Sequence, residues 1–152
     1  MSDPAARTPE QRVSTGAAPA GLAPLTRPER VRLVAEILRA YAIVRWRMRE
    51  PDIRIAIAHL RGESSGERRI DFPLTRRLAR GVVRTLTLLP TDSRCLARSL
   101  VLDRLLTRRS LASVVVIAAQ SGAKFEAHAW VEHDGVAVLP PGSEGYQRLV
   151  EI

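Results

Sequence analysis

The residues best suited to covalent chemistry are the single cysteine, Cys95, and a histidine further along the chain, His128. A thiolate is a strong nucleophile, and a nearby imidazole can take the thiol proton and later protonate an amine leaving group. A cysteine at a helix start followed by a histidine in a strand is typical of a Cys–His catalytic pair. The same two residue types also occur as a quiet buried cysteine and a structural histidine, so the spacing alone leaves both interpretations open.

The segment that presents Cys95 has the features of a helix start. Pro90 ends the preceding element, and Thr91 or Asp92 can cap the first turn. With Asp92 as the cap, Cys95 occupies the third helical position, where free amides and the helix dipole favour a thiolate. Its own amide could also donate to an oxyanion. The helix that follows is apolar on nearly every side, which predicts a buried central helix; its apolar residues are Leu96, Leu100, Val101, Leu102, Leu105 and Leu106.

The segment that carries His128 alternates as a strand over residues 124–133. His128 falls on its more polar face beside Trp130, which could shield a thiolate–imidazolium pair. Asp134-Gly135 is a strong two-residue hairpin signal. We therefore expect residues 136–139 to return antiparallel, a buried strand over 112–119 to precede this hairpin, and a short last element over 146–152.

The first half of the chain is expected to be helical. Thr26 and Glu29 form a capping box with Pro28 between them, which opens a helix to about residue 48. A second amphipathic helix is expected over 73–88, and a short helix containing His59 over 53–61, followed by a polar loop over 62–71. Apolar positions of the first helix form one stripe, widened by a second set: Val31, Val34, Leu38 and Tyr41, then Leu33, Ile37 and Val44.

This order of elements predicts an α+β fold, in which N-terminal helices and a central cysteine-bearing helix pack on a small antiparallel sheet. The expected organisation is a disordered tail over 1–25 and one domain over 26–152. Within that domain, residues 26–89 form the helical part, and residues 90–152 form the catalytic helix and the sheet. A chain of 152 residues suffices for one such core.

Composition restricts the class of protein further. One cysteine excludes an internal disulfide, and three histidines without metal-ligand spacing argue against a metal site, so we expect no cofactor. The net charge of +8 comes almost entirely from arginine. These arginines are scattered and lack interleaved aromatics, so nucleic acid is not the expected partner, whereas an acidic peptide is compatible. No segment suits a membrane span or a signal peptide, which predicts a cytoplasmic protein.

Two motifs resemble one known family. The cysteine motif is Leu88-Leu89-Pro90-Thr91-Asp92-Ser93-Arg94-Cys95-Leu96-Ala97-Arg98-Ser99-Leu100, and the histidine motif is Ala127-His128-Ala129-Trp130-Val131-Glu132, followed by Asp134-Gly135. Together they resemble the transglutaminase-like cysteine peptidases of lasso-peptide gene clusters, which process microcin precursors. The resemblance covers the chain from about Leu74 onward. It implies a papain/transglutaminase-like fold, with Cys95 as nucleophile and His128 as general base.

The resemblance also implies a third catalytic residue that this chain lacks in the expected register. The family carries an aspartate about a dozen residues after the histidine, where this sequence has Leu139-Pro140-Pro141. Loss of an orienting acid can lower the rate by orders of magnitude. The candidates that remain for orienting His128 are a backbone carbonyl or one of several carboxylates: Asp134, Glu132, Glu126 and Glu144.

The function implied is removal of the leader from a ribosomally made lasso-type precursor. The implied partners are the precursor peptide, a separate leader-recognition protein and a macrolactam cyclase. Two alternatives stay open. One is a catalytically weak or inactive member of the same fold that binds the precursor during maturation. The other is a basic nucleic-acid-binding module, which would act independently of Cys95 and weaken steeply with salt.

Overall fold

The structure, a computed structural model, describes residues 22–49, 68–89, 94–121, 125–142 and 145–151. The tail expected up to residue 25 falls mostly outside these ranges, as does the short helix expected over 53–61 with His59. The described elements are, in chain order, α1 (Arg27–Arg47), α3 (Phe72–Thr87), α4 (Arg94–Thr107), β1 (Val114–Ser121), β2 (Phe125–His133), β3 (Val136–Ala137) and β4 (Gln147–Glu151).

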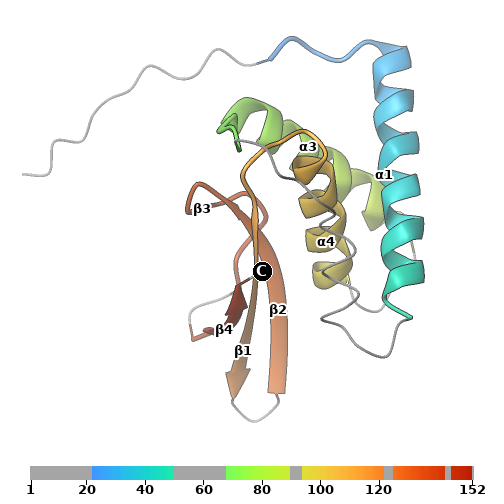
Figure 1. The fold of residues 1–152 in the computed structure, drawn as a ribbon. Helices are drawn as coiled ribbons and strands as arrows, with labels where there is room; N and C mark the ends of the chain where they lie inside the picture. The colour runs from blue at the N-terminus through green and yellow to red at the C-terminus, as the bar shows by residue number, and fades with distance from the viewer. Residues whose placement is uncertain (1–21, 50–67, 90–93, 122–124, 143–144, 152) are drawn as a thin grey trace, which may run out of the picture.

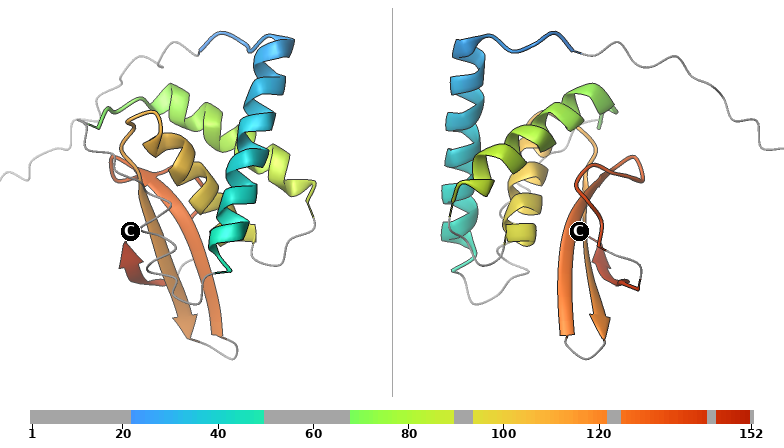
Figure 2. Two further views of the ribbon diagram at one scale, coloured as in Figure 1. Left: turned by 45° about the vertical axis from the view of Figure 1, so that its right-hand side comes forward. Right: turned by 180° about the vertical axis from the view of Figure 1, so that it is seen from behind.

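The described elements form a helical layer on an antiparallel sheet, as the α+β prediction required. Helix α4 lies between α1 and the sheet, with α3 crossing beside it (Figures 1 and 2). It contacts both other helices and packs on β1 and β2. Because it has neighbours on every side, its apolar residues are almost all inaccessible to solvent: Leu100, Val101, Leu102, Leu105 and Leu106. The prediction of a buried central helix is confirmed.

Local signals explain where the first two helices begin. The Glu29 carboxylate accepts hydrogen bonds from the Thr26 amide at 2.7 Å and the Thr26 hydroxyl at 2.8 Å, which is the predicted capping box. These bonds lower the pKa of Glu29. At the start of α3, the Asp71 side chain accepts from the Leu74 amide at 2.9 Å. Asp71, which the sequence placed at the end of a loop, is therefore the N-cap of α3.

The apolar stripe expected on α1 is only partly the buried one. The core receives Ile37, Ala40 and Val44 from this helix. Val31 is 69% exposed and Leu38 is 40% exposed, so the first of the two predicted sets points mainly outward. The helix packs on α3 and α4 together, and the position of those two neighbours selects the face; helical periodicity identifies apolar positions without that information.

The sheet has the strand order β3-β2-β1-β4, and every neighbouring pair is antiparallel. The β2–β3 hairpin turns at Asp134 and Gly135, whose φ angles of 51° and 72° are both left-handed. A type I′ turn requires this pair of angles, so the hairpin prediction is confirmed. β3 has only two residues, fewer than the four expected, and the last element is β4 on the opposite edge. The chain between β3 and β4 must therefore cross β2 and β1.

A buried histidine joins the start of α3 to the sheet. His133 is fully buried; its Nε2 accepts a hydrogen bond from the Asp71 amide at 3.0 Å, while its Nδ1 contacts the Ala112 carbonyl oxygen. Because a carbonyl only accepts and an amide only donates, the proton must sit on Nδ1. The ring also meets the Phe72 ring edge-on, with centroids 4.8 Å apart. His133 is thus a structural histidine held in one neutral tautomer.

An ion pair fastens α1 to the end of α4. Arg109 donates to both carboxylate oxygens of Glu36, at 2.9 and 2.6 Å, and to the Leu105 carbonyl oxygen at 3.0 Å. Both side chains are 28% exposed. The hydrogen bonds from Arg109 lower the pKa of Glu36 despite its partial burial. The pair therefore contributes stability only while Glu36 is ionised.

Replacing Glu36 with glutamine is expected to lower the free energy of unfolding by about 1 to 2 kcal/mol near neutral pH. Since the folded pKa of Glu36 lies below its unfolded value, this contribution is complete above the unfolded pKa and disappears as the pH falls through the folded pKa. Urea unfolding of wild type and variant at pH 7 and at pH 3 measures the difference. A double-mutant cycle with Arg109→Gln isolates the pair, and an equal loss at both pH values would contradict this assignment.

Candidate active site

Cys95 is the second residue of α4, which begins at Arg94. It is partly exposed and unbonded to other sulfur. The predicted cap residues Thr91 and Asp92 lie outside the described residues. The cysteine is thus within the first turn of a helix whose apolar side chains are mostly buried, so a rigid element holds the thiol at the protein surface. The amides of a helix start are free to donate hydrogen bonds, so this position suits the binding of an oxyanion.

His128 lies in the first half of β2, opposite Ala118 of β1, and is partly exposed. Its Nε2 lies 3.0 Å from the backbone carbonyl oxygen of Pro140. A carbonyl oxygen can only accept, so Nε2 carries the proton and donates it to Pro140. In the neutral ring this leaves Nδ1 with a free lone pair, which is the atom that can act as a base.

The group that orients His128 is therefore main chain. Pro140 stands in the register where the resemblance leads one to expect an aspartate, and its carbonyl oxygen accepts the hydrogen bond from His128 Nε2. Proline cannot donate a backbone hydrogen bond, but its carbonyl is a full acceptor. A backbone carbonyl was one of the candidates left open by the sequence, and the described contacts favour it.

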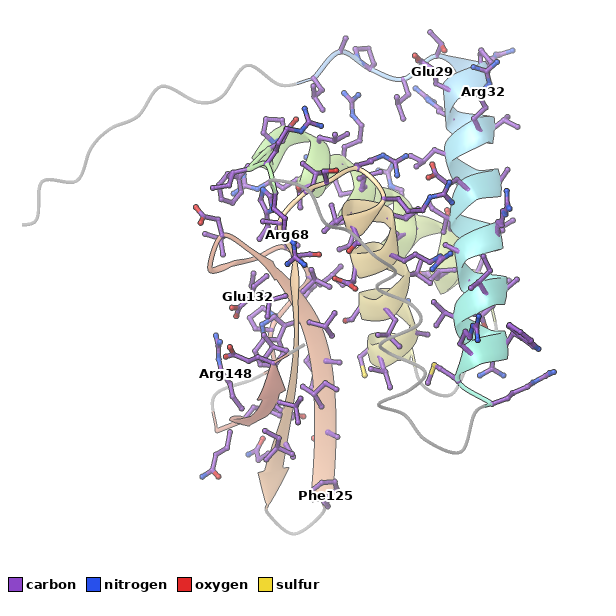
Figure 3. All side chains as sticks on the ribbon, in the orientation of Figure 1. Glu29, Arg32, Arg68, Phe125, Glu132 and Arg148 are labelled. Atoms are coloured by element: carbon purple, nitrogen blue, oxygen red, sulfur yellow. The ribbon has the colours of Figure 1, made fainter. Side chains whose placement is uncertain are left out.

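Neither carboxylate named as a possible third member contacts His128 in the described residues. Glu132 accepts from the Trp130 indole at 2.9 Å and forms an ion pair with Arg148 at 2.6 Å. Asp134 is exposed in the hairpin turn, where its left-handed φ of 51° explains its presence. Glu132 and Arg148 lie close together on the side of the sheet away from α1 (Figure 3). Their role is to join β2 to β4 across β1.

Tyr146 lies against His128 at the start of the last strand. The two ring centroids are 5.9 Å apart, and the phenol donates to Glu126 at 3.2 Å. The tyrosine ring rests on Gly142, where an added Cβ would come within 2.6 Å of it, so this position requires glycine. Desolvation, the bond to Glu126 and the negative charge of a Cys95 thiolate together raise the pKa of Tyr146. Tyr146 thus contacts the histidine and lies within electrostatic range of the cysteine.

The relation between Cys95 and His128 is therefore indirect in the described residues. Helix α4 packs on β2, and Tyr146 contacts His128 and lies within electrostatic range of Cys95, but no hydrogen bond joins the sulfur to the imidazole among the contacts of these residues. Trp130 also lies beside the imidazole: the two rings are inclined by 25° with their centroids 6.1 Å apart, and Trp130 is 5% exposed. The aromatic neighbour predicted from the alternating pattern is thus present.

Sequence reasoning missed two members of this environment. Pro140 acts through its backbone, and a backbone acceptor has no side-chain signature that a motif could reveal. Tyr146 directly precedes β4, the strand at the far edge of the sheet, and only the crossing of the chain brings it to His128. The signal that was available is the Pro140-Pro141-Gly142 run, which marks a break in the strand, but it carries no information on what the carbonyl contacts.

The described residues contain no group of three or more histidine, cysteine, aspartate or glutamate side chains that could hold a metal ion. Their helices also include none with the length and hydropathy needed to cross a bilayer.

Comparison with known families agrees with this architecture. The sequence model of the transglutaminase-like superfamily matches residues 37–151, which is most of the chain, and the chain belongs to that superfamily. Membership is consistent with cysteine-based peptidase or transglutaminase chemistry in general. Comparisons with curated proteins and with solved structures gave no match.

Proposed function

We propose that this member of the transglutaminase-like superfamily is a cysteine peptidase that removes the leader from a ribosomally made, lasso-type precursor peptide. The observation that carries the chemistry is the hydrogen bond from His128 Nε2 to the Pro140 carbonyl oxygen. It makes Nδ1 the basic atom of a ring that lies on the sheet against which the cysteine-bearing helix packs. The choice of substrate rests on the resemblance of the two motifs around Cys95 and His128.

The proposed reaction has two stages. In the first, His128 Nδ1 takes the proton of Cys95, and the sulfur attacks the scissile carbonyl carbon of the precursor. The tetrahedral oxyanion is stabilised by amides at the start of α4, and its collapse breaks the C–N bond as the imidazolium protonates the leaving amine. In the second, His128 removes a proton from water, and the hydroxide hydrolyses the thioester to release the carboxylate and the free thiol.

The partners are part of the same proposal. The precursor peptide is the substrate, a separate protein recognises its leader, and a macrolactam cyclase uses the liberated amine. The catalytically inactive alternative is favoured by one observation, the absence of a carboxylate on His128 in the described residues. A neutral carbonyl orients the ring but stabilises the imidazolium less than an aspartate does.

Thiol alkylation separates these two readings. Wild-type protein is expected to react with iodoacetamide at neutral and mildly acidic pH, where an ordinary cysteine is mostly protonated. The His128→Ala variant should react more slowly there, because the base is gone. Cys95→Ser is the control that shows the label is on Cys95, the single cysteine of the chain. Equal and sluggish reaction of wild type and His128→Ala would contradict a working pair and leave a precursor-binding protein.

A further inference from the structure

A row of arginines runs along the outer face of α3. Arg76, Arg80 and Arg84 are spaced four residues apart, so they lie on one face of the helix, and all three are exposed. In the part of the chain that the structure describes, none of the three has an acidic partner. Parallel guanidinium groups without counter-charges repel one another, and a bound anion would relieve that repulsion.

The arginine row borders a hollow of about 450 Å³ between α3 and the segment that follows β3. Its floor is aliphatic, formed by Ala79 and Val83 of α3, and its opposite wall is residues 137–140. That wall ends at Pro140, whose carbonyl oxygen holds His128. The hollow therefore runs from the positive face of α3 to the residue that orients the proposed base.

A second, larger hollow of about 630 Å³ lies on the other side of the row, between α1 and α3, and the chain itself enters it. Leu22 and Leu25 line this hollow. The Arg77 guanidinium donates to the Ala23 carbonyl oxygen, and Arg30 donates to the Leu25 carbonyl oxygen at 3.0 Å. Residues 22–25, an apolar stretch whose backbone is held by arginines, thus already occupy the larger hollow. No described segment occupies the smaller hollow in the same way.

We infer that the hollow between α3 and residues 137–140 binds an extended peptide that alternates acidic and aliphatic side chains, and that Arg76, Arg80 and Arg84 select it. The aliphatic floor takes the apolar side chains, and the arginine row takes the carboxylates. β3 is an edge strand of the sheet, so it also offers backbone groups to an extended chain. This inference rests on the proposed function, because it names the part of the peptide substrate that lies beside His128.

The lining favours a peptide over a nucleic acid. Single-stranded nucleic acid is held by aromatic platforms on which bases stack, and this hollow is lined by aliphatic residues, arginines and one proline. Guanidinium groups pair with carboxylates as well as with phosphates, so charge alone does not decide between them. The aliphatic floor favours the peptide, because it offers no aromatic surface on which bases could stack. An oligonucleotide serves as the competing ligand in the test.

The test measures binding to the full chain carrying Cys95→Ala, so that no turnover is required. A fluorescein-labelled peptide that alternates glutamate with leucine is titrated by fluorescence anisotropy, beside versions with glutamine or lysine in place of glutamate. We expect the acidic peptide to bind tightest. The triple variant Arg76→Glu/Arg80→Glu/Arg84→Glu should bind the acidic peptide about tenfold more weakly or worse. The triple variant with lysine at the same three positions should retain most of the affinity.

The matched control carries the same charge change on exposed arginines of α1 that do not line the hollow, Arg32→Glu/Arg39→Glu/Arg45→Glu; Figure 3 shows Arg32 near the start of that helix. Equal losses in both triple variants would overturn the inference, since general attraction would explain them. Tighter binding of an oligonucleotide than of the acidic peptide would also overturn it. If the peptide binds as expected but no precursor is cleaved by the wild type, the proposed peptidase fails while the arginine site stands.

Discussion

Replacing His128 with alanine is expected to slow precursor cleavage by about a thousandfold or more while the protein stays folded. The imidazole is partly exposed, and among the described residues it bonds to the Pro140 carbonyl oxygen, so removing it empties little buried space. The chemical step, in contrast, loses both the base that activates Cys95 and the acid that protonates the leaving amine. Single-turnover cleavage of a precursor, followed by mass spectrometry, measures the rate, and circular dichroism checks the fold.

Tyr146→Phe provides the matched comparison for this site. It keeps the ring that lies against His128 and removes only the hydroxyl that donates to Glu126. We expect cleavage to fall far less than in His128→Ala, because the phenol has no proton to transfer in the proposed reaction. Cleavage by His128→Ala at a rate near wild type would rule out His128 as the base.

Replacing His133 with alanine is expected to act on stability, lowering the free energy of unfolding by about 3 kcal/mol. The substitution leaves a cavity in a fully buried position and removes the hydrogen-bond partners of the Asp71 amide and the Ala112 carbonyl. Chemical unfolding monitored by circular dichroism gives the difference. His128→Ala, measured alongside, should change stability by less than about 1 kcal/mol.

His133→Gln serves as a second variant that retains hydrogen-bonding groups in the same place. It should recover part of the stability, since an amide side chain can both donate and accept. A His133→Ala protein as stable as wild type would show that contacts other than those of His133 hold α3 against the sheet. These variants therefore distinguish the two histidines: we expect His128 to act on the reaction and His133 on the fold.

Short-range signals predicted the fold well. The capping box at Thr26 and Glu29, the apolar run of α4 and the Asp134-Gly135 turn each depend on residues within a few positions of one another. Such patterns report local backbone geometry, so they are readable without knowing the tertiary structure. The same reasoning could not choose the buried face of α1, because that choice depends on where α3 and α4 lie.

The candidate site was predictable only in part for the same reason. Cys95 and His128 are visible as residue types in suitable local elements, and they remain the proposed pair. The contact partner of His133, Asp71, lies 62 residues earlier in the chain, and the partner of His128 is a carbonyl oxygen. The contact between Asp71 and His133 can be predicted only from the tertiary fold. The contact between His128 and a carbonyl oxygen cannot be recognised from residue type, because every residue has that group.

Because a backbone carbonyl oxygen holds His128, substitutions at position 140 have an unusual effect. Every amino acid at position 140 brings a carbonyl oxygen, so Pro140→Ala keeps the acceptor in place wherever the backbone keeps its path. If Cys95 and His128 form the proposed pair, alanine scanning would report the loss of either side chain but not the loss of the group that orients the imidazole, because Pro140→Ala retains the carbonyl oxygen.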